Sequence, residues 1–316
     1  MDPVCHTLVG ASLGGTGLAR KTRFGAATLV VAANLPDVDA VSYFFDGAAA
    51  YAIRRGVTHG IPALVVLPVV LAAVVTGIAR IRPSPAREAS FRWLLLLSAI
   101  GVWSHPSLDW LNTYGMRWLM PFANRWFYGD TLFIIDWVVW LTLITGLVAA
   151  WALRRRPLEW FRRPATIALA LLVTYIGSNF MLTRVAMNEA LAATRPFPPQ
   201  RLMASPVPFD PLRREIVFEY DNEYRLGTVR FTPLPRFETR PAIIAKGDAV
   251  WLDRAREHVD GQQFLSWARF PYSVVEQTDS GTVLWVADAR YVADPTQQRM
   301  RGFGAVRLEL ADGRAR

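Results

Sequence analysis

Three of the four histidines of this 316-residue chain lie in its apolar N-terminal half, in the company of aspartates. His6 is near the start, His59 ends the run 55–59 (RGVTH), and His105 opens the run 105–109 (HPSLD). Ionisable side chains are costly at membrane depth, so those found there commonly serve function. Imidazole and carboxylate together are the ligands of hydrolytic zinc and related metal centres. The residue types therefore predict a metal site.

The spacing of the aspartates supports one shared site. His105 and Asp109 are four residues apart, so on a helix both side chains face the same way and reach one ion. Asp37 and Asp39 are two apart and directly follow a proline. On a helix their carboxylates would diverge, but around a turn they can converge on one metal or bridge two.

Each of these residues also has an ordinary interpretation. A single histidine at a membrane surface is usually an interfacial polar residue. Asp37 could cap a helix, and Asp109 could pair with Arg117. Asp130 and Asp136 could be loop or interfacial acids, and the sequence leaves open whether either joins the site.

Further polar residues could hold a substrate. Arg54 and Arg55 are the only basic residues between Arg23 and Arg80, and Arg55 precedes His59 by four residues. If this stretch begins a helix, the two side chains share a face. A guanidinium there can bind a phosphate or carboxylate through a two-pronged contact. The alternative is that Arg55 only reaches lipid headgroups.

Long apolar stretches must position these residues. Residues 56–79 and 164–183 contain no charged side chain, while 93–116 and 131–153 contain one aspartate each. Each is long enough to cross a bilayer core as a helix, which takes about 20 residues. The weaker stretches 3–19 and 24–45 predict shorter helices inside the bundle or partly re-entrant segments. We therefore expect a mainly α, polytopic helical membrane bundle with about 5–6 membrane-embedded helices.

The net charge of +9 is distributed as a membrane protein would distribute it. Its basic residues form three clusters between the apolar stretches, which the positive-inside rule assigns to cytoplasmic loops rather than to a nucleic-acid surface. The clusters are Arg20, Lys21 and Arg23; Arg80, Arg82, Arg87 and Arg92; and Arg154, Arg155, Arg156, Arg162 and Arg163. With these loops inside, the histidines and aspartates all fall near the outer face. We expect a multi-pass protein of the cell (inner) membrane and no nucleic-acid partner.

The second half has a different character. We expect a membrane-embedded domain over 1–193, a Pro-rich linker or extended wrap over 194–211, and an extracytoplasmic β-rich α+β domain over 212–316. Alternating apolar and polar residues predict its strands, and residues 254–268 predict one helix that carries His258. The expected strands cover 214–220, 224–231, 282–292 and 303–310. The chain start lacks the positive region of a secretory signal, and Cys5 is expected to be a buried small residue without metal.

The motifs together resemble a known family. His6 near the start, 35–39 (LPDVD), 55–59 (RGVTH), and 105–109 (HPSLD) followed by 112–115 (NTYG) are similar to the YdjM-type membrane-bound metal-dependent hydrolases, which are LexA-regulated inner-membrane proteins. The resemblance covers roughly residues 1–140. It implies a bacterial or archaeal membrane hydrolase with a helical core, distantly analogous to zinc-dependent phospholipase C.

The family's ligand roles transfer residue by residue onto matching positions. They fall on His6, Asp37, Asp39, His59, His105 and Asp109. Gly60 stands where the family usually has serine, so no hydroxyl role follows there. The resemblance implies the reaction class more than the substrate.

We therefore expect a metal-dependent hydrolase that uses Zn²⁺, with Mn²⁺ as the alternative, on a phosphoester of a lipid or lipid-linked substrate at the outer membrane face. Asp39 is the expected general base, Arg55 would hold the phosphate, and Asn112 or Tyr114 would orient it. One alternative is an ion-coupled transporter, against which we see no inverted repeat. Another is a structural or sensory membrane protein stabilised by metal.

Overall fold

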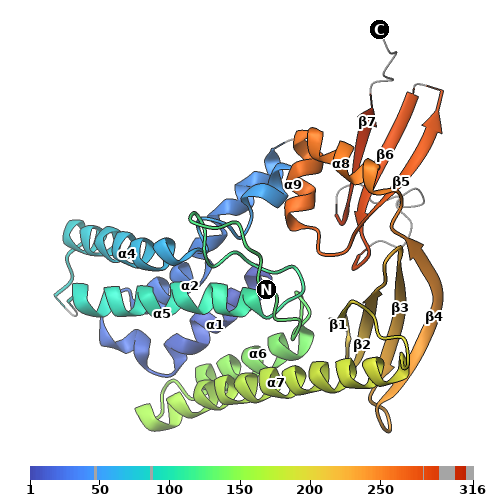
Figure 1. Ribbon diagram of the computed structural model, residues 1–316. Helices are drawn as coiled ribbons and strands as arrows, with labels where there is room; N and C mark the ends of the chain where they lie inside the picture. Colours follow the sequence, from blue (N-terminus) through green and yellow to red (C-terminus); the bar gives the residue numbers. More distant parts are fainter. Residues whose placement is uncertain (46–47, 86–87, 280, 292–302, 311–316) are drawn as a thin grey trace. The chain divides into compact units, whose positions relative to one another are not determined.

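A computed structural model describes residues 1–45, 48–85, 88–279, 281–291 and 303–310 (Figure 1). The chain divides into two compact units. The helical unit comprises Met1–Asp39, Arg55–Leu182 and Pro206–Pro211. The β-rich unit comprises Ala40–Arg54, Thr183–Ser205 and Leu212–Arg316.

The helical unit contains six long or medium α-helices, of which the last continues into the β-rich unit. Helix α5 packs against α2 and α4, and α1 packs against α2 and α6 (Figure 1). The elements are α1 (Pro3–Gly15), η1 (Leu18–Lys21), α2 (Gly25–Asn34), η2 (Leu35–Phe44), α4 (Ile61–Ile81), α5 (Phe91–Trp110), α6 (Trp137–Ala152) and α7 (Leu158–Ala193).

Each apolar stretch expected from the sequence overlaps one of these helices, but two boundaries differ in a way that matters for the site. The stretch 24–45 stops being α-helical at Asn34 and continues as the 3₁₀ segment η2. Helix α4 begins only at Ile61, after the extended residue Gly60. The run 55–59 is therefore a turn, and the helix expected to carry Arg55 and His59 on one face does not form there.

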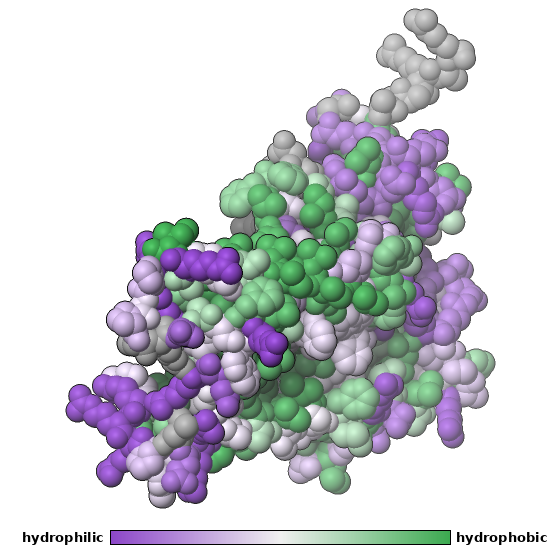
Figure 2. Space-filling model, turned by 90° about the vertical axis from the view of Figure 1, so that its left-hand side faces the viewer, coloured by the Kyte–Doolittle hydropathy of each residue, from purple (hydrophilic) through white to green (hydrophobic). Residues whose placement is uncertain are grey.

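Among the described residues, two helices are long and apolar enough to cross a membrane, Ile61–Ile81 and Glu159–Ala193, and Trp137–Ala152 is apolar but shorter. Large apolar side chains are exposed along the two long helices, such as Val65 on α4 and Val173 on α7. Figure 2 shows hydrophobic residues over much of the face that it presents, with hydrophilic residues in separate patches. The expected number of five to six embedded helices goes beyond these two.

Close backbone contact joins α2 and α5 at a glycine. A Cβ added to Gly101 would lie 2.5 Å from the Cβ of Ala32 and 3.0 Å from the carbonyl oxygen of Leu29. We expect Gly101→Ala to destabilise the protein by about 1–3 kcal/mol, the usual effect of overpacking. Gly77→Ala is the matched control, because no atom lies within 4 Å of its added Cβ. The thermal midpoints of the purified variants test this. A midpoint for Gly101→Ala at or above that for Gly77→Ala would contradict it.

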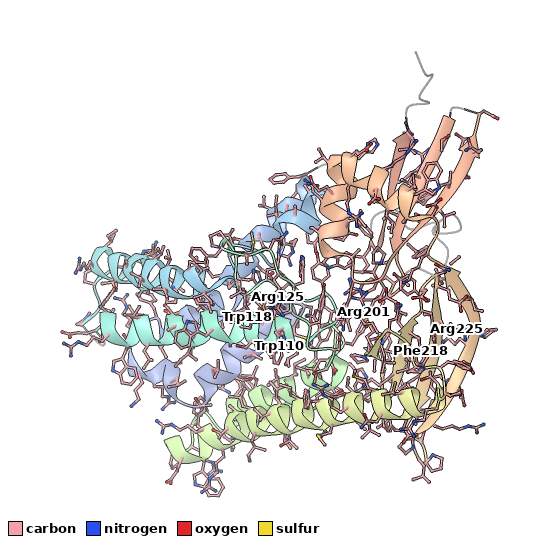
Figure 3. The ribbon with its side chains drawn as sticks, in the orientation of Figure 1. Trp110, Trp118, Arg125, Arg201, Phe218 and Arg225 are labelled. Atoms are coloured by element: carbon pink, nitrogen blue, oxygen red, sulfur yellow. The ribbon has the colours of Figure 1, made fainter. Side chains whose placement is uncertain are left out.

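The β-rich unit contains two sheets, with strand orders β1-β2-β3-β4 and β5-β6-β7. Adjacent strands from β2 to β4 and from β5 to β7 run antiparallel, and Phe218 on β2 faces Arg225 on β3 in register (Figure 3). The strands are β1 (Arg201–Val207), β2 (Asp210–Glu219), β3 (Glu223–Arg230), β4 (Arg236–Ala245), β5 (Pro271–Thr278), β6 (Gly281–Asp288) and β7 (Ala305–Leu310). Its helices include α3 (Ala49–Ile53), α8 (Ala249–Glu257) and α9 (Val259–Trp267).

The expected strands at 214–220, 224–231, 282–292 and 303–310 correspond to β2, β3, β6 and β7, with residue 292 outside the described residues. Three other strands were not expected. Strand β1 lies inside the predicted Pro-rich linker, where the prolines obscure its alternation. Most residues of β4 are exposed and it contains a proline, as is typical of edge strands. The predicted helix 254–268 is two helices, which meet at the extended residue His258.

A short segment from the N-terminal half belongs to the β-rich unit. Within residues 40–54, the backbone N–H of Ala48 donates to Asp260 Oδ1 at 2.9 Å. The Tyr51 ring packs against aromatic side chains of α9, and its hydroxyl accepts from the N–H of Gly304 at 3.0 Å. Burial raises the pKa of Tyr51 to about 12, so the hydroxyl stays protonated. The two units are thus interleaved in sequence, which the predicted domain order did not include.

Candidate metal centre

Four side chains bring metal-binding atoms together in the helical unit. They are Asp37 on η2, His59 in the turn before α4, and His105 and Asp109 on the last turns of α5. One ligand atom from each lies within 4.8 Å of the others. Three of the side chains are fully buried and that of Asp37 is 13% exposed, so the cluster is closed except on the Asp37 side.

Five distances between the donor atoms, from 3.1 to 3.9 Å, are near those expected around a tetrahedral ion. The Nε2 atoms of His59 and His105 are 3.1 Å apart. Asp109 Oδ2 lies 3.4 Å from the first and 3.6 Å from the second, and Asp37 Oδ1 lies 3.9 Å and 3.6 Å from them. Ligands about 2.0–2.2 Å from a zinc ion are roughly 3.3–3.6 Å apart in a tetrahedron. Two imidazoles and two carboxylates at these distances could hold one divalent cation.

Neighbouring groups set the tautomers of both histidines. Nδ1 of His105 lies 2.6 Å from the carbonyl oxygen of Ala33, which can only accept, so Nδ1 carries the proton. Nδ1 of His59 lies 3.3 Å from Asp39 Oδ2 and 3.0 Å from Thr58 Oγ1. Burial lowers the pKa of His59 to about 4, so this imidazole is neutral at pH 7. Each Nε2 then directs a lone pair into the cluster, the arrangement in which imidazole binds a metal.

Asp39 lies behind His59 and outside the four-donor cluster. Its Oδ2 accepts from Thr58 Oγ1 and from the backbone N–H of Arg55, each at 2.8 Å, beside His59 Nδ1. The sequence predicted Asp39 as a ligand and a general base. Its position is that of a carboxylate that orients a metal-binding histidine, a partner whose loss commonly lowers metal affinity about 10–100-fold.

This position can be tested by metal affinity. We expect Asp39→Asn to weaken divalent-metal binding by about 10–100-fold while keeping one saturable site, because the ligands remain but His59 is oriented less firmly. Asp37→Ala should abolish tight binding, because it removes a donor. Chelator competition on the purified variants measures both, with the exposed Asp253→Asn as control. Complete loss of the site in Asp39→Asn would instead make Asp39 a ligand.

Arg55 connects the four-donor cluster to the loop after α5. Its Nε lies 2.9 Å from Asp109 Oδ2, and its Nη1 donates to Asn112 Oδ1 at 2.9 Å and to the carbonyl oxygen of Gly115 at 3.1 Å. The guanidinium also lies 4.8 Å from the ring centre of Tyr114. The side chain is only 2% exposed. Arg55 thus holds a cluster carboxylate directly, whatever else it contacts.

Asn112 and Tyr114, predicted to orient a substrate, lie beside this arginine. Asn112 Oδ1 accepts from Arg55 and also from the backbone N–H of Tyr114 at 2.9 Å, which fixes the orientation of the amide. Asn112 Nδ2 is buried and has no hydrogen-bond partner among the described residues. This leaves one buried donor next to the cluster.

His6, the remaining predicted ligand, is adjacent to the cluster but directed at its other side. Its ring stacks on that of His105, with centres 3.7 Å apart. Its Nε2 lies 3.2 Å from Asp109 Oδ1, the oxygen that also meets the N-terminal amine of Met1. Asp109 presents Oδ2 to the four-donor cluster, whereas His6 contacts its other oxygen, Oδ1. His6 is therefore connected to the cluster only through the Asp109 carboxylate. Its role as a ligand stays a prediction.

The other acidic candidates lie outside the four-donor cluster. Asp136 caps α6, accepting from the backbone N–H groups of Val138 and Val139, and it also accepts from the hydroxyl of Tyr175. Asp130 is likewise not among the four. The cations against Asp109 are Arg55 and the N-terminal amine of Met1, whereas Arg117 donates to Asn124.

Sequence reasoning missed three groups that hold the site. Thr58 lies within the quoted motif 55–59, so its proximity to His59 could have suggested a role. The other two are the backbone carbonyl groups of Ala33 and Gly115. A backbone carbonyl leaves no signal in residue type, so only the fold reveals such contacts.

The helical unit and its site define a class: membrane proteins with a buried histidine–aspartate cluster that could bind a metal ion. The family model of the YdjM inner membrane protein matches residues 1–186, more than half of the chain, and the chain belongs to this family. A relative, the Bacillus subtilis (strain 168) protein named "Uncharacterized protein YfhP", is 26% identical over 134 residues. That match covers 40% of this chain and 39% of the relative. No solved structure is significantly similar to the chain.

Proposed function

We propose that the protein is a membrane-bound metal-dependent hydrolase that acts on a phosphoester of a lipid or lipid-linked substrate at the outer face of the membrane. The four-donor cluster carries this proposal, because its spacing and its two fixed tautomers suit a divalent cation. Nitrogen and oxygen donors in tetrahedral spacing favour Zn²⁺, whereas Mn²⁺ prefers six oxygen-rich ligands.

Asp37, His59, His105 and Asp109 would hold the ion, which would supply Lewis acidity for the hydrolysis of a polarised bond. Asp37 is the exposed member, and its oxygen lies furthest from His59 Nε2. We therefore place the approach of the substrate on the Asp37 side. A donor at that position can loosen to admit a substrate while the three buried donors stay in place.

The proposed substrate class follows from the groups around the cluster. Arg55 brings a buried positive charge, and Asn112 Nδ2 offers a donor without an acceptor among the described residues. Both suit an anionic oxygen such as that of a phosphoester. The membrane family makes lipids and lipid-linked compounds the substrates within reach.

The test is hydrolysis by the full chain in detergent or nanodiscs, assayed against a panel of phosphoester lipids with added Zn²⁺ or Mn²⁺. We expect hydrolysis of the phosphoester bond, seen as release of a phosphorylated headgroup or of free phosphate. A chelator should abolish this activity, and added metal should restore it. His105→Ala should be inactive. A metal-loaded wild type without activity on any phosphoester of the panel would contradict the proposed reaction.

A second candidate is a metal-stabilised structural or sensory membrane protein. The observation that favours it is the number of protein donors, since four close a tetrahedral site and catalytic zinc sites usually keep one position open. Metal removal would then lower the thermal midpoint strongly without any hydrolysis at full occupancy.

The orientation can be tested separately. We expect a reporter fused after residue 316 to work only outside the cytoplasm and one inserted in loop 82–90 to work only inside. The reason is the three basic clusters, which the positive-inside rule places in the cytoplasm. Paired alkaline phosphatase and fluorescent-protein fusions measure this. The reverse pattern would place the proposed site at the cytoplasmic leaflet.

A further inference from the structure

A cavity of about 370 Å³ lies where α4 ends and α5 begins. The cavity is separate from the four-donor cluster, because none of the four donor residues lines it. Its lining combines charged, hydroxyl and apolar side chains. These are Arg23, Thr76, Ala79, Arg80, Pro83, Ser84, Glu88, Ala89 and Phe91.

The charges around this cavity are of both signs and do not neutralise one another. Arg23, Arg80 and Glu88 all line it, yet within the described part of the chain none of the three forms an ion pair. Arg23 is fixed along the cavity, because its Nη1 donates to the carbonyl oxygen of Arg82 and its backbone N–H to that of Glu88. Two guanidinium groups and one carboxylate are thus available to a ligand that carries both a negative and a positive group.

The start of α5 adds backbone donors. Ser90 precedes the helix and its side chain makes no capping hydrogen bond, while its own N–H donates to Thr22 Oγ1 at 2.8 Å. Phe91, the first helical residue, lines the cavity. Backbone N–H groups at a helix N-terminus favour an anion such as phosphate. Together with the two arginines, the start of α5 makes this end of the cavity favourable for an anionic group.

The depth of the cavity suits a lipid headgroup. Helix α4 has 21 residues. At about 1.5 Å per residue it is roughly 31 Å long, close to the ~30 Å thickness of a bilayer core. The cavity lies at its C-terminal end, among basic residues, and therefore at the level of the headgroups. Basic pockets between helices at that level commonly bind lipid headgroups.

We infer that this cavity binds a phospholipid headgroup of the phosphoethanolamine type. Arg23 and Arg80 contact its phosphate, and the carboxylate of Glu88 accepts from its primary ammonium group. Ala79, Ala89 and Phe91 provide the apolar side that meets the glycerol and the first acyl carbons. A glycerol headgroup lacks the cation, and a choline headgroup has no N–H to donate. This site is independent of the proposed hydrolase activity.

Native mass spectrometry of the full chain, released from detergent with phosphatidylethanolamine, phosphatidylglycerol or phosphatidylcholine, tests the inference. We expect wild type to retain phosphatidylethanolamine about tenfold more strongly than phosphatidylcholine, since a charge-assisted hydrogen bond is lost with choline. Arg80→Gln should lower retention of all three lipids. Glu88→Gln should lower only that of phosphatidylethanolamine, to the level of phosphatidylcholine.

Arg155→Gln and Glu159→Gln are the matched controls, because both residues are exposed and neither lines the cavity. They should retain lipid as wild type does. Equal retention of phosphatidylethanolamine by Glu88→Gln and wild type would overturn the inference. So would competition by free phosphoethanolamine at the same concentration as the lipid, which would make the ligand a soluble compound.

Discussion

Purified wild-type protein should contain at least one zinc or manganese ion per chain, and His59→Ala and His105→Ala should each lose most of it. Each substitution removes one of two Nε2 atoms that lie 3.1 Å apart among two carboxylates. Without a cation, two imidazole lone pairs would face each other in a buried cluster. Elemental analysis of the three proteins, purified in parallel, measures the effect.

The fourth histidine provides a matched control for this experiment. His258 lies between α8 and α9 in the β-rich unit, outside the four-donor cluster. His258→Ala should keep the metal content of wild type. If wild type stays metal-free after supplementation with zinc and manganese, the cluster is not a metal centre and the proposed hydrolase function fails with it.

Arg55→Lys should reduce hydrolysis at least about tenfold while metal content remains, because lysine keeps the charge but loses the planar fork. The native side chain meets Asp109, Asn112 and Gly115 through two nitrogen atoms. One ammonium group cannot reproduce that geometry. Arg55→Gln should be worse and should also destabilise the fold, since it removes one of the two cations that meet the buried Asp109 carboxylate.

The measurement is kcat/KM on the most active phosphoester lipid, together with metal content and thermal midpoint for each variant. Arg125→Lys is the control, an exposed arginine in the loop that follows α5 (Figure 3). Full activity of Arg55→Lys with metal retained would show that the fork is not needed and that a positive charge beside Asp109 is enough.

The part of the site that residue type and helical spacing specify was predictable. His105 and Asp109 lie four apart on a helix, so their convergence follows from periodicity alone. The distinction between Asp37 and Asp39 did not follow, because a 3₁₀ segment decides which carboxylate enters the cluster. The same holds for Arg55, which acts from a turn with a positive φ of 50° rather than from a helix face.

The β-rich unit was predictable where a strand contributes several buried residues. Strands β2, β3 and β6 each contain four or five buried residues, so apolar side chains mark them in the sequence. Strand β4 faces solvent along most of its length, so no hydrophobic pattern marks it. The placement of residues 40–54 in this unit depends on contacts with residues more than 200 positions away, for which local sequence carries no signal.

That segment has a consequence for the order in which the protein matures. Ala48 and its partner Asp260 are 212 residues apart, so the ribosome releases residues 40–54 long before their binding surface exists. Domains generally fold as units, in the order of synthesis. Here residues 40–54, which connect the Asp37 motif to the His59 motif, can pack only after the C-terminal part of the chain has been synthesised. A chain that ends between Asp109 and α9 therefore contains all four candidate donors, while the segment that connects Asp37 to His59 still lacks its binding surface.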